Sequence, residues 1–246
     1  MVPAWLHGLS IGSLLLGGVC AAVVAADEIR RPQRMWIMNV VWPLTALFGS
    51  LLVLCQYRMC GRGATAQQVA AGQRGEELSG RDRNPFHATV ANGTLHCGAG
   101  CTLGDICAEW LAVWVPAVPV SFGWHSLFVT KMFAVWILDY IFAYAFGIVF
   151  QYFTIAPMRG LSVGAGLVAA VKADTLSLTA WQVGMYTFMA IAYVAVFRAA
   201  LRTDLNAAMP EFWFMMQIAM RCGFVTSYPV NWWLIRTGIK ERMKVQ

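Results

Sequence analysis

Long apolar runs dominate this chain, and they restrict its fold more than any other feature of the sequence. A helix needs about 20 apolar residues to cross a hydrocarbon core about 30 Å thick. We predict membrane helices over six runs, at 5–26, 36–57, 86–115, 127–156, 177–197 and 210–235. Only 12% of the residues are charged and 59% are hydrophobic, whereas soluble domains carry about 25% charged residues. The sequence therefore predicts an all-α, polytopic membrane helix bundle.

The boundaries of these helices divide the chain into three regions. We expect an N-terminal two-helix membrane hairpin (1–57), a polar loop (58–86) and a four-helix membrane core (87–246). Pro43 predicts a bend in the second helix, because proline removes a backbone donor. Residues 160–173 form either a short helix, a re-entrant piece or the start of a longer fifth helix.

Arginine and lysine residues between the apolar runs indicate the orientation of the chain. Cytoplasmic loops carry an excess of these residues, so the basic C-terminal tail (236–244) predicts a cytoplasmic C-terminus in a bacterial inner membrane. With six spans, two basic turns then lie on the wrong side, one with Arg30 and Arg31 and one with Arg198 and Arg202. The net charge of +6 follows from membrane topology, so we expect the lipid bilayer and not a nucleic acid as the partner.

The third predicted helix carries the residues best suited to chemistry. Residues four apart share one helix face, so Cys97, Cys101, Asp105 and Glu109 form one stripe that begins beside His96. Thiolate and imidazole groups are ligands for copper(I) and zinc. We therefore hypothesise a soft-metal site with His96, Cys97, Cys101 and Asp105, and we expect copper(I) as the ion.

Two other interpretations of this segment stay open. Cysteine behaves as a small buried hydrophobe in most proteins, and Gly100, Gly104 and Ala108 form an adjacent stripe of small residues. Such a stripe allows another helix to approach closely. Alternatively, His96 and Asp105 lie at the membrane interface and have no ligand.

Methionines in the last two helices are a second, weaker signal for a soft metal. Met185 and Met189 lie one turn apart in the fifth helix, and Met216 and Met220 do so in the sixth. Thioethers bind copper(I), but methionine also fills gaps in ordinary cores. A ligand role is predicted only if these side chains face Cys97 and Cys101.

Further charges fall within or beside apolar runs. Ionisable groups at membrane depth are costly and usually functional. Lys172 is a candidate ion-pair partner for Asp139 or for its neighbour Asp174, and a proton or ion path is the alternative. In the sixth helix, Pro229 frees a backbone carbonyl, which indicates either a simple kink or a broken helix.

Several motifs together resemble a known family. The segments HCGAGCTLGD (96–105), FQYFTIAPM (150–158), KADTLSLTA (172–180) and TSYPVNWWL (226–234) are similar to a prokaryotic multi-pass membrane family known only as a domain of unknown function. The stretch 36–43 resembles the N-terminal part of that family. The resemblance implies the fold and the membrane location but no mechanism.

Three functional hypotheses follow. The first is a protein that binds or moves a soft metal ion, the second is a structural subunit of a larger membrane complex or a homo-oligomer, and the third is a transporter that uses Asp105, Asp139 and Lys172. We expect no enzymatic activity, because phosphate-loop, zinc-protease and serine-hydrolase motifs do not occur in the sequence.

Overall fold

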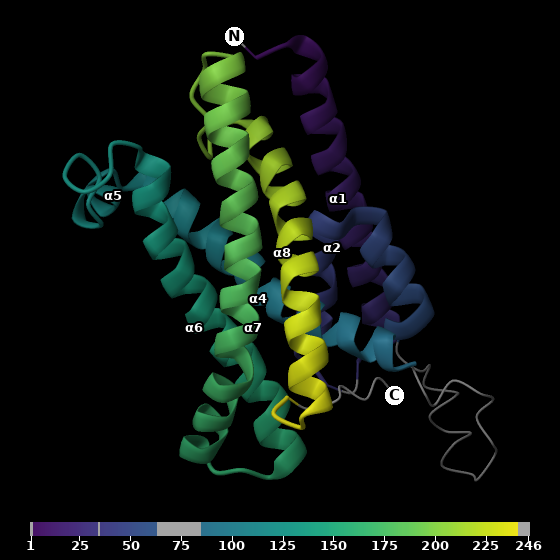
Figure 1. Ribbon diagram of the computed structural model, residues 1–246. Helices are drawn as coiled ribbons and strands as arrows, with labels where there is room; N and C mark the ends of the chain where they lie inside the picture. The colour runs from purple at the N-terminus through teal and green to yellow at the C-terminus, as the bar shows by residue number, and fades with distance from the viewer. Residues whose placement is uncertain (1, 34, 63–84, 241–246) are drawn as a thin grey trace.

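The computed structural model describes residues 2–33, 35–62 and 85–240, and within them the chain is a bundle of helices, as predicted (Figure 1). The predicted loop 58–86 beyond Arg62 and the tail after Lys240 lie outside the described residues. The elements are α1 (Ala4–Arg30), α2 (Met38–Gln56), η1 (Tyr57–Gly61), α4 (Phe86–Trp114), α5 (Ala117–Ser121), α6 (Lys131–Arg159), α7 (Val163–Ile191), η2 (Ala192–Ala200) and α8 (Pro210–Arg236).

Four of these elements are long and apolar enough to cross a membrane. They are α1, α2 with η1, α6, and α7 with η2. Helices α4 and α8 are similarly long but more polar. Residues 160–173 belong for the most part to α7, so the third of the sequence-based alternatives, a longer fifth helix, is correct.

Helix α4 lies inside the bundle and packs antiparallel to α6. A side chain at Gly104 would meet the backbone nitrogen of Ala143, and one at Gly100 would lie 2.9 Å from the Cα atom of Gly147. The small-residue stripe therefore holds α4 against α6 of the same chain. Close approach of two backbones maximises dispersion contacts where lipid supplies no hydrophobic driving force.

Helix α2 does not run straight but reverses direction at Ser50. The Ser50 backbone has φ 47° and ψ −124°, a conformation that non-glycine residues rarely adopt. A side chain at Gly61 would lie 2.6 Å from the Trp42 ring, although a straight helix would separate these residues by about 28 Å. We call Met38–Gly61 the α2 hairpin and residues 47–50 its tip.

Both ends of the α2 hairpin are fixed beside the end of α1. The Gln33 backbone N–H donates to the Asn39 side chain over 2.9 Å, and the Gln33 side chain donates to the Gly61 carbonyl over 2.8 Å. The Tyr57 hydroxyl donates to Asp27 over 2.9 Å. The break in α2 lies at Ser50, whereas Pro43, where the sequence predicts a bend, lies inside the helix. Gly–Ser pairs are a common cause of sharp kinks, and Gly49–Ser50 is such a pair.

One end of the bundle collects most of the described arginines. Helices α1, α6 and α8 end there, and α4 and α7 begin there (Figure 1). The Phe86 and Trp232 rings, 4.7 Å apart, join the start of α4 to the end of α8. We call this the basic end; it carries Arg30, Arg31, Arg58, Arg62, Arg159 and Arg236. The α2 hairpin leaves the basic end and returns to it, so α4 begins at the same end at which α1 stops. Arg30 and Arg31 therefore share an end of the bundle with Arg236.

Candidate functional site

A cavity of about 180 Å³ lies where the tip of the α2 hairpin meets the rest of the bundle. Its lining comes from α1, the hairpin tip, α4 and α8, namely Leu14, Leu47, Phe48, Thr102, Asp105, Ile106, Trp213, Met216, Gln217 and Met220. One water takes about 30 Å³ of liquid volume. The cavity is therefore large enough for a small solute or several waters.

Asp105 is the only carboxylate in this lining. Its side chain is fully buried, and neither carboxylate oxygen has a hydrogen-bond partner among the described residues. Burying an unpaired charge is strongly unfavourable. The carboxyl group therefore requires a proton or a nearby cation, and Asp105 lies in the wall of the cavity from which either could come.

The hairpin tip supplies the opposite wall of the cavity and is fixed by α8. Because the helix breaks at Ser50, the carbonyls of Leu47 and Phe48 lose their usual partners one turn ahead. The Gln217 side chain donates to the Leu47 carbonyl over 2.6 Å, and the Arg221 guanidinium donates to the Phe48 carbonyl over 3.1 Å. Non-helical backbone at membrane depth is tolerated where protein or a water-filled cavity surrounds it.

Three further carboxylates continue from Asp105 through the interior. Glu109 and Asp139 lie close enough to Asp105 for their charges to interact. Within the described chain, both oxygens of Asp139 and one oxygen of Glu109 have no hydrogen-bond partner. Lys131 is the cation that acts on Glu109. We call Asp105, Glu109, Asp139 and Asp174 the core carboxylates.

Asp174 lies nearer the basic end. Its carboxylate sits where a side chain at Gly147 would be and is adjacent to the Cys97 thiol. Neither oxygen has a hydrogen-bond partner in the part of the chain that the structure describes. The nearby cation is Lys240, whose charge acts on Asp174 and also on His96.

Lysines bound to α4 lie at the two ends of the core carboxylates. The Lys131 ammonium donates to the Ala112 carbonyl over 2.9 Å, and the Lys240 ammonium donates to the Gly93 carbonyl over 3.4 Å. At a rise of about 1.5 Å per residue, Gly93 and Ala112 are about 28 Å apart. This length is close to the hydrocarbon thickness of about 30 Å.

The predicted metal ligands on α4 come together only in part. The Cys97 and Cys101 thiols are adjacent, and Cys97 also lies beside Asp174. His96 instead faces α6, with its Nε2 atom 3.3 Å from the Thr154 hydroxyl, and Asp105 lies in the wall of the cavity. Over residues 2–33, 35–62 and 85–240, no group of three or more His, Cys, Asp and Glu is arranged to hold a metal ion. The His96 and Asp105 side chains are 1% and 0% exposed, so both lie in the interior of the protein.

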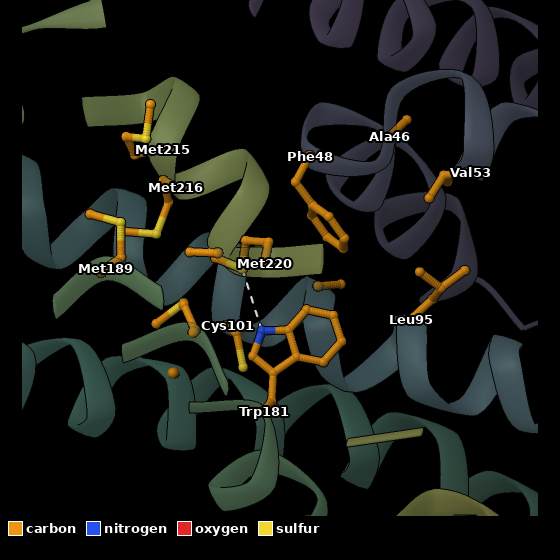
Figure 2. Close-up of a cluster of buried hydrophobic side chains, with 14 of the residues drawn as sticks. Ala46, Phe48, Val53, Leu95, Cys101, Trp181, Met189, Met215, Met216 and Met220 are labelled. Carbon is orange, nitrogen blue, oxygen red and sulfur yellow. Dashed lines mark hydrogen bonds between the residues drawn. The ribbon is translucent and has the colours of Figure 1, made fainter. Parts of the chain in front are cut away.

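Met189, Met216 and Met220 lie in the same buried cluster as Cys101 (Figure 2). Met185 belongs to this cluster as well, and Met216 and Met220 also line the cavity with Asp105. The Trp181 indole N–H donates to the Met220 sulfur over 3.4 Å. The condition set from the sequence, that these methionines face both Cys97 and Cys101, stays a prediction.

The candidate ion pair between Lys172 and Asp139 is not formed within the described residues. Lys172 is exposed at the surface of α7, and Asp139 is fully buried without a hydrogen-bond partner among the described residues. Lys172 also makes no ion pair with Asp174 in this part of the structure. Asp139 and Asp174 are thus members of an unpaired buried set and do not form local ion pairs.

Sequence reasoning missed the hairpin tip and the residues that fix it. Ser50, Gln217 and Arg221 were not selected, although Gly49–Ser50 is a recognisable kink signal. Lys131 and Lys240 were also missed. A basic residue at a predicted helix end normally indicates an interfacial anchor, and nothing local distinguishes one that turns inward.

The comparison with protein families supports the family expectation from the sequence. A family model described as Domain of unknown function (DUF4396) matches residues 87–240, more than half of the chain. The chain belongs to this family. The DUF4396 match contains all the core carboxylates, Lys131 and Lys240, whereas α1 and the α2 hairpin lie outside it. No curated protein and no solved structure matches the chain.

Proposed function

We propose that this protein is an integral membrane transport protein that carries a small monovalent cation through the bundle, with Asp105 as the central binding group. One observation carries the proposal: the buried Asp105 carboxylate has no hydrogen-bond partner among the described residues, and Asp105 lies in the wall of a cavity that the tip of a broken helix also lines. In secondary transporters, discontinuous helices and ionisable groups meet in this way near the middle of the bilayer.

The same proposal assigns a topology. Helices α1, α4, α6, α7 and α8 cross the membrane, and the α2 hairpin enters and leaves at the basic end. This arrangement has five crossings instead of the six predicted. It places the basic end, with Arg30, Arg31 and Arg236, on the cytoplasmic side. Among the described residues, Lys131, Arg198 and Arg202 then lie at the other end, against the positive-inside tendency.

The charge of the core carboxylates favours a cation as the solute. Four acidic side chains are buried around α4, and no basic side chain pairs with any of them in the described part of the chain. An anion would be repelled by each carboxylate that is ionised. A cation or proton lowers the cost of burying them.

Flux through reconstituted protein tests the proposal. Purified protein in liposomes that contain a pH-sensitive dye should show proton movement under an imposed potential, or uptake of radioactive sodium or rubidium. Asp105→Asn removes the central carboxylate, so it should lower the transport rate of whichever cation the wild type carries by at least about tenfold. A factor of ten corresponds to about 1.4 kcal/mol.

A matched control separates this role from general damage to the protein. Asp204 is 71% exposed and pairs with Arg198 at the surface, so Asp204→Asn should leave the flux unchanged. The proposal fails if Asp105→Asn, folded and inserted, transports each of the three cations as the wild type does, or if the wild type transports none of them.

Copper(I) is a second candidate, favoured by one specific observation. Two thioethers, those of Met216 and Met220, line the same cavity as Asp105, and thioethers bind soft copper(I). Cys101 lies beside them in the core (Figure 2). A soft-metal protein would therefore use sulfur ligands from α4 and α8, with fewer histidine and carboxylate ligands than the sequence predicted.

Metal analysis distinguishes the two candidates. Protein purified with excess copper(I) under reducing conditions should retain about one equivalent, and Met216→Leu/Met220→Leu and Cys97→Ser/Cys101→Ser variants should each lose most of it. Equal, near-zero copper in all three proteins would end the soft-metal proposal and leave the sodium, rubidium and proton measurements to decide the first.

A further inference from the structure

We infer that Asp174, Asn231 and the Gly93 carbonyl form a second cation site on the path, and that Lys240 is a tethered cation that closes this site at the basic end. The inference rests on the proposed function, because it assumes that a cation passes through the bundle. It assigns a site and a gate at the end of the path opposite to Lys131.

The chain turns back at the end of α8 to bring Lys240 inside. Gly238 has φ 76°, a left-handed conformation that glycine adopts without steric cost. The Lys240 backbone N–H then donates to the Leu234 carbonyl over 3.0 Å. As a result Lys240 is only 2% exposed, although a lysine at a helix end normally extends into water.

The Lys240 ammonium is held by oxygen atoms alone. It donates to the Asn231 side-chain oxygen over 2.8 Å and to the Gly93 carbonyl over 3.4 Å. Side-chain and backbone oxygens are also the ligands that coordinate alkali cations in transport proteins. The position that Lys240 fills is therefore suitable for a small monovalent cation.

Asn231 is oriented for this purpose by its own hydrogen bonds. Its side-chain N–H₂ group donates to the Ser177 hydroxyl over 2.7 Å and to the Ser227 hydroxyl over 2.9 Å. The Ser227 hydroxyl donates to the Ser177 carbonyl over 2.8 Å. Because these contacts fix the amide nitrogen, the amide oxygen is left to face Lys240.

Asp174 gives the independent sign that this region takes a cation. It is 1% exposed, no residue in the described ranges forms an ion pair with its carboxylate, and the polar group against it is the Cys97 thiol. The Lys240 ammonium is the nearby positive charge but lies outside ion-pair contact with it. Lys240 therefore lies between the basic end and a carboxylate that has no ion-pair partner of its own among the described residues.

Withdrawal of Lys240 would open this end of the path. The ammonium would return to water, and Asn231, Gly93 and Asp174 would be free for a transported cation. While Lys240 is in place, its positive charge repels any cation that approaches Asp174 from the basic end. The tethered lysine thus closes the path by its charge.

Accessibility of Cys97 tests the gate without any need for transport. Cys97 is 1% exposed and lies beside Asp174, so it reports entry from the basic end. In protein in nanodiscs in which Cys97 is the only cysteine, Lys240→Ala should raise the rate of labelling by a small cationic thiosulfonate at least tenfold. Lys172→Ala, at an exposed position on α7, should leave the rate unchanged.

A second pair of variants covers the case in which Lys240→Ala does not stay folded. Lys240→Arg keeps a tethered cation and should label slowly, whereas Lys240→Met keeps the length without the charge and should label fast. Equal labelling of the folded Lys240 variants and the parent protein would overturn the gate. That result would leave the proposed function standing if flux still depends on Asp105. Flux that is independent of Asp105 would remove the proposed function whatever the labelling shows.

Discussion

The Trp42 and Tyr57 rings pack edge to face with their centroids 5.4 Å apart, although a straight helix would separate these residues by about 22 Å. This contact closes the α2 hairpin at its base. It brings the aromatic side chains of both limbs together beside the end of α1, while the tip reaches Asp105 in the interior. A segment long enough to span the membrane therefore enters and leaves at one end of the bundle.

The two limbs of the α2 hairpin should open to the same side of the membrane. In a cysteine-free background, Arg31→Cys and Arg58→Cys should both react with an impermeant maleimide from one side only. Leu127 is 81% exposed and lies at the opposite end of the bundle. Leu127→Cys should therefore react from the other side of the membrane. Labelling of positions 31 and 58 from opposite sides would mean that α2 crosses the membrane.

Close packing of α4 on α6 should make Gly104 intolerant of a side chain. Gly104→Ala places a methyl group against the Ala143 backbone, and overpacking of this kind costs about 1–3 kcal/mol. Gly18→Ala in α1 meets nothing within 4 Å, so it should be neutral or slightly stabilising. Thermal unfolding of both variants in the same detergent measures the difference, and equal midpoints would contradict the contact.

The hairpin tip should depend on its donor from α8. Arg221→Met leaves the Phe48 carbonyl without the guanidinium that satisfies it, and loss of a charged donor to a buried acceptor costs about 1–3 kcal/mol. Arg236→Met, at an exposed position in the last turn of α8, should cost much less. Unfolding midpoints in detergent check the comparison. Limited proteolysis should show earlier cleavage within the α2 hairpin of Arg221→Met alone.

The charged residues named from the sequence should not contribute equally to transport. Asp139→Asn should reduce cation flux at least severalfold, because Asp139 is fully buried and interacts with Asp105 and Glu109. Lys172→Met should leave flux unchanged, because Lys172 is exposed and pairs with neither Asp139 nor Asp174. The liposome assay measures both rates. A loss of flux in Lys172→Met equal to that in Asp139→Asn would restore the ion pair expected from the sequence.

Helix positions were predictable because the length of an apolar run and the prolines near its ends are local properties of the sequence. The predicted run 210–235 differs from α8 by one residue at its end, and 86–115 differs from α4 likewise. The reversal of α2 was not predictable in this way. Its apolar run continues through Ser50, and the reversal depends on Trp42, Tyr57 and Gly61 meeting across the hairpin.

The candidate site was found only in outline. Asp105 and Asp139 stood out because charge within an apolar run is unusual at any position. Their directions could not be read from helical spacing, since Cys97 and Asp105 share a stripe on α4 yet face different neighbours. The inward turn of Lys240 depends on Gly238, and glycine near a helix end more often indicates an ordinary C-cap.

The buried position of α4 has a consequence for how the protein is made. Asp105 and Glu109 lie in its second half, and a carboxylate at the centre of an inserting helix costs about 2.5–3.5 kcal/mol on biological insertion scales. Alone, α4 is a poor substrate for the translocon. Because Gly100 and Gly104 fit directly against Gly147 and Ala143 of α6, the two helices are suited to leave the translocon together as an antiparallel pair. Substitutions at these α4–α6 contacts should then reduce the yield of inserted protein during synthesis.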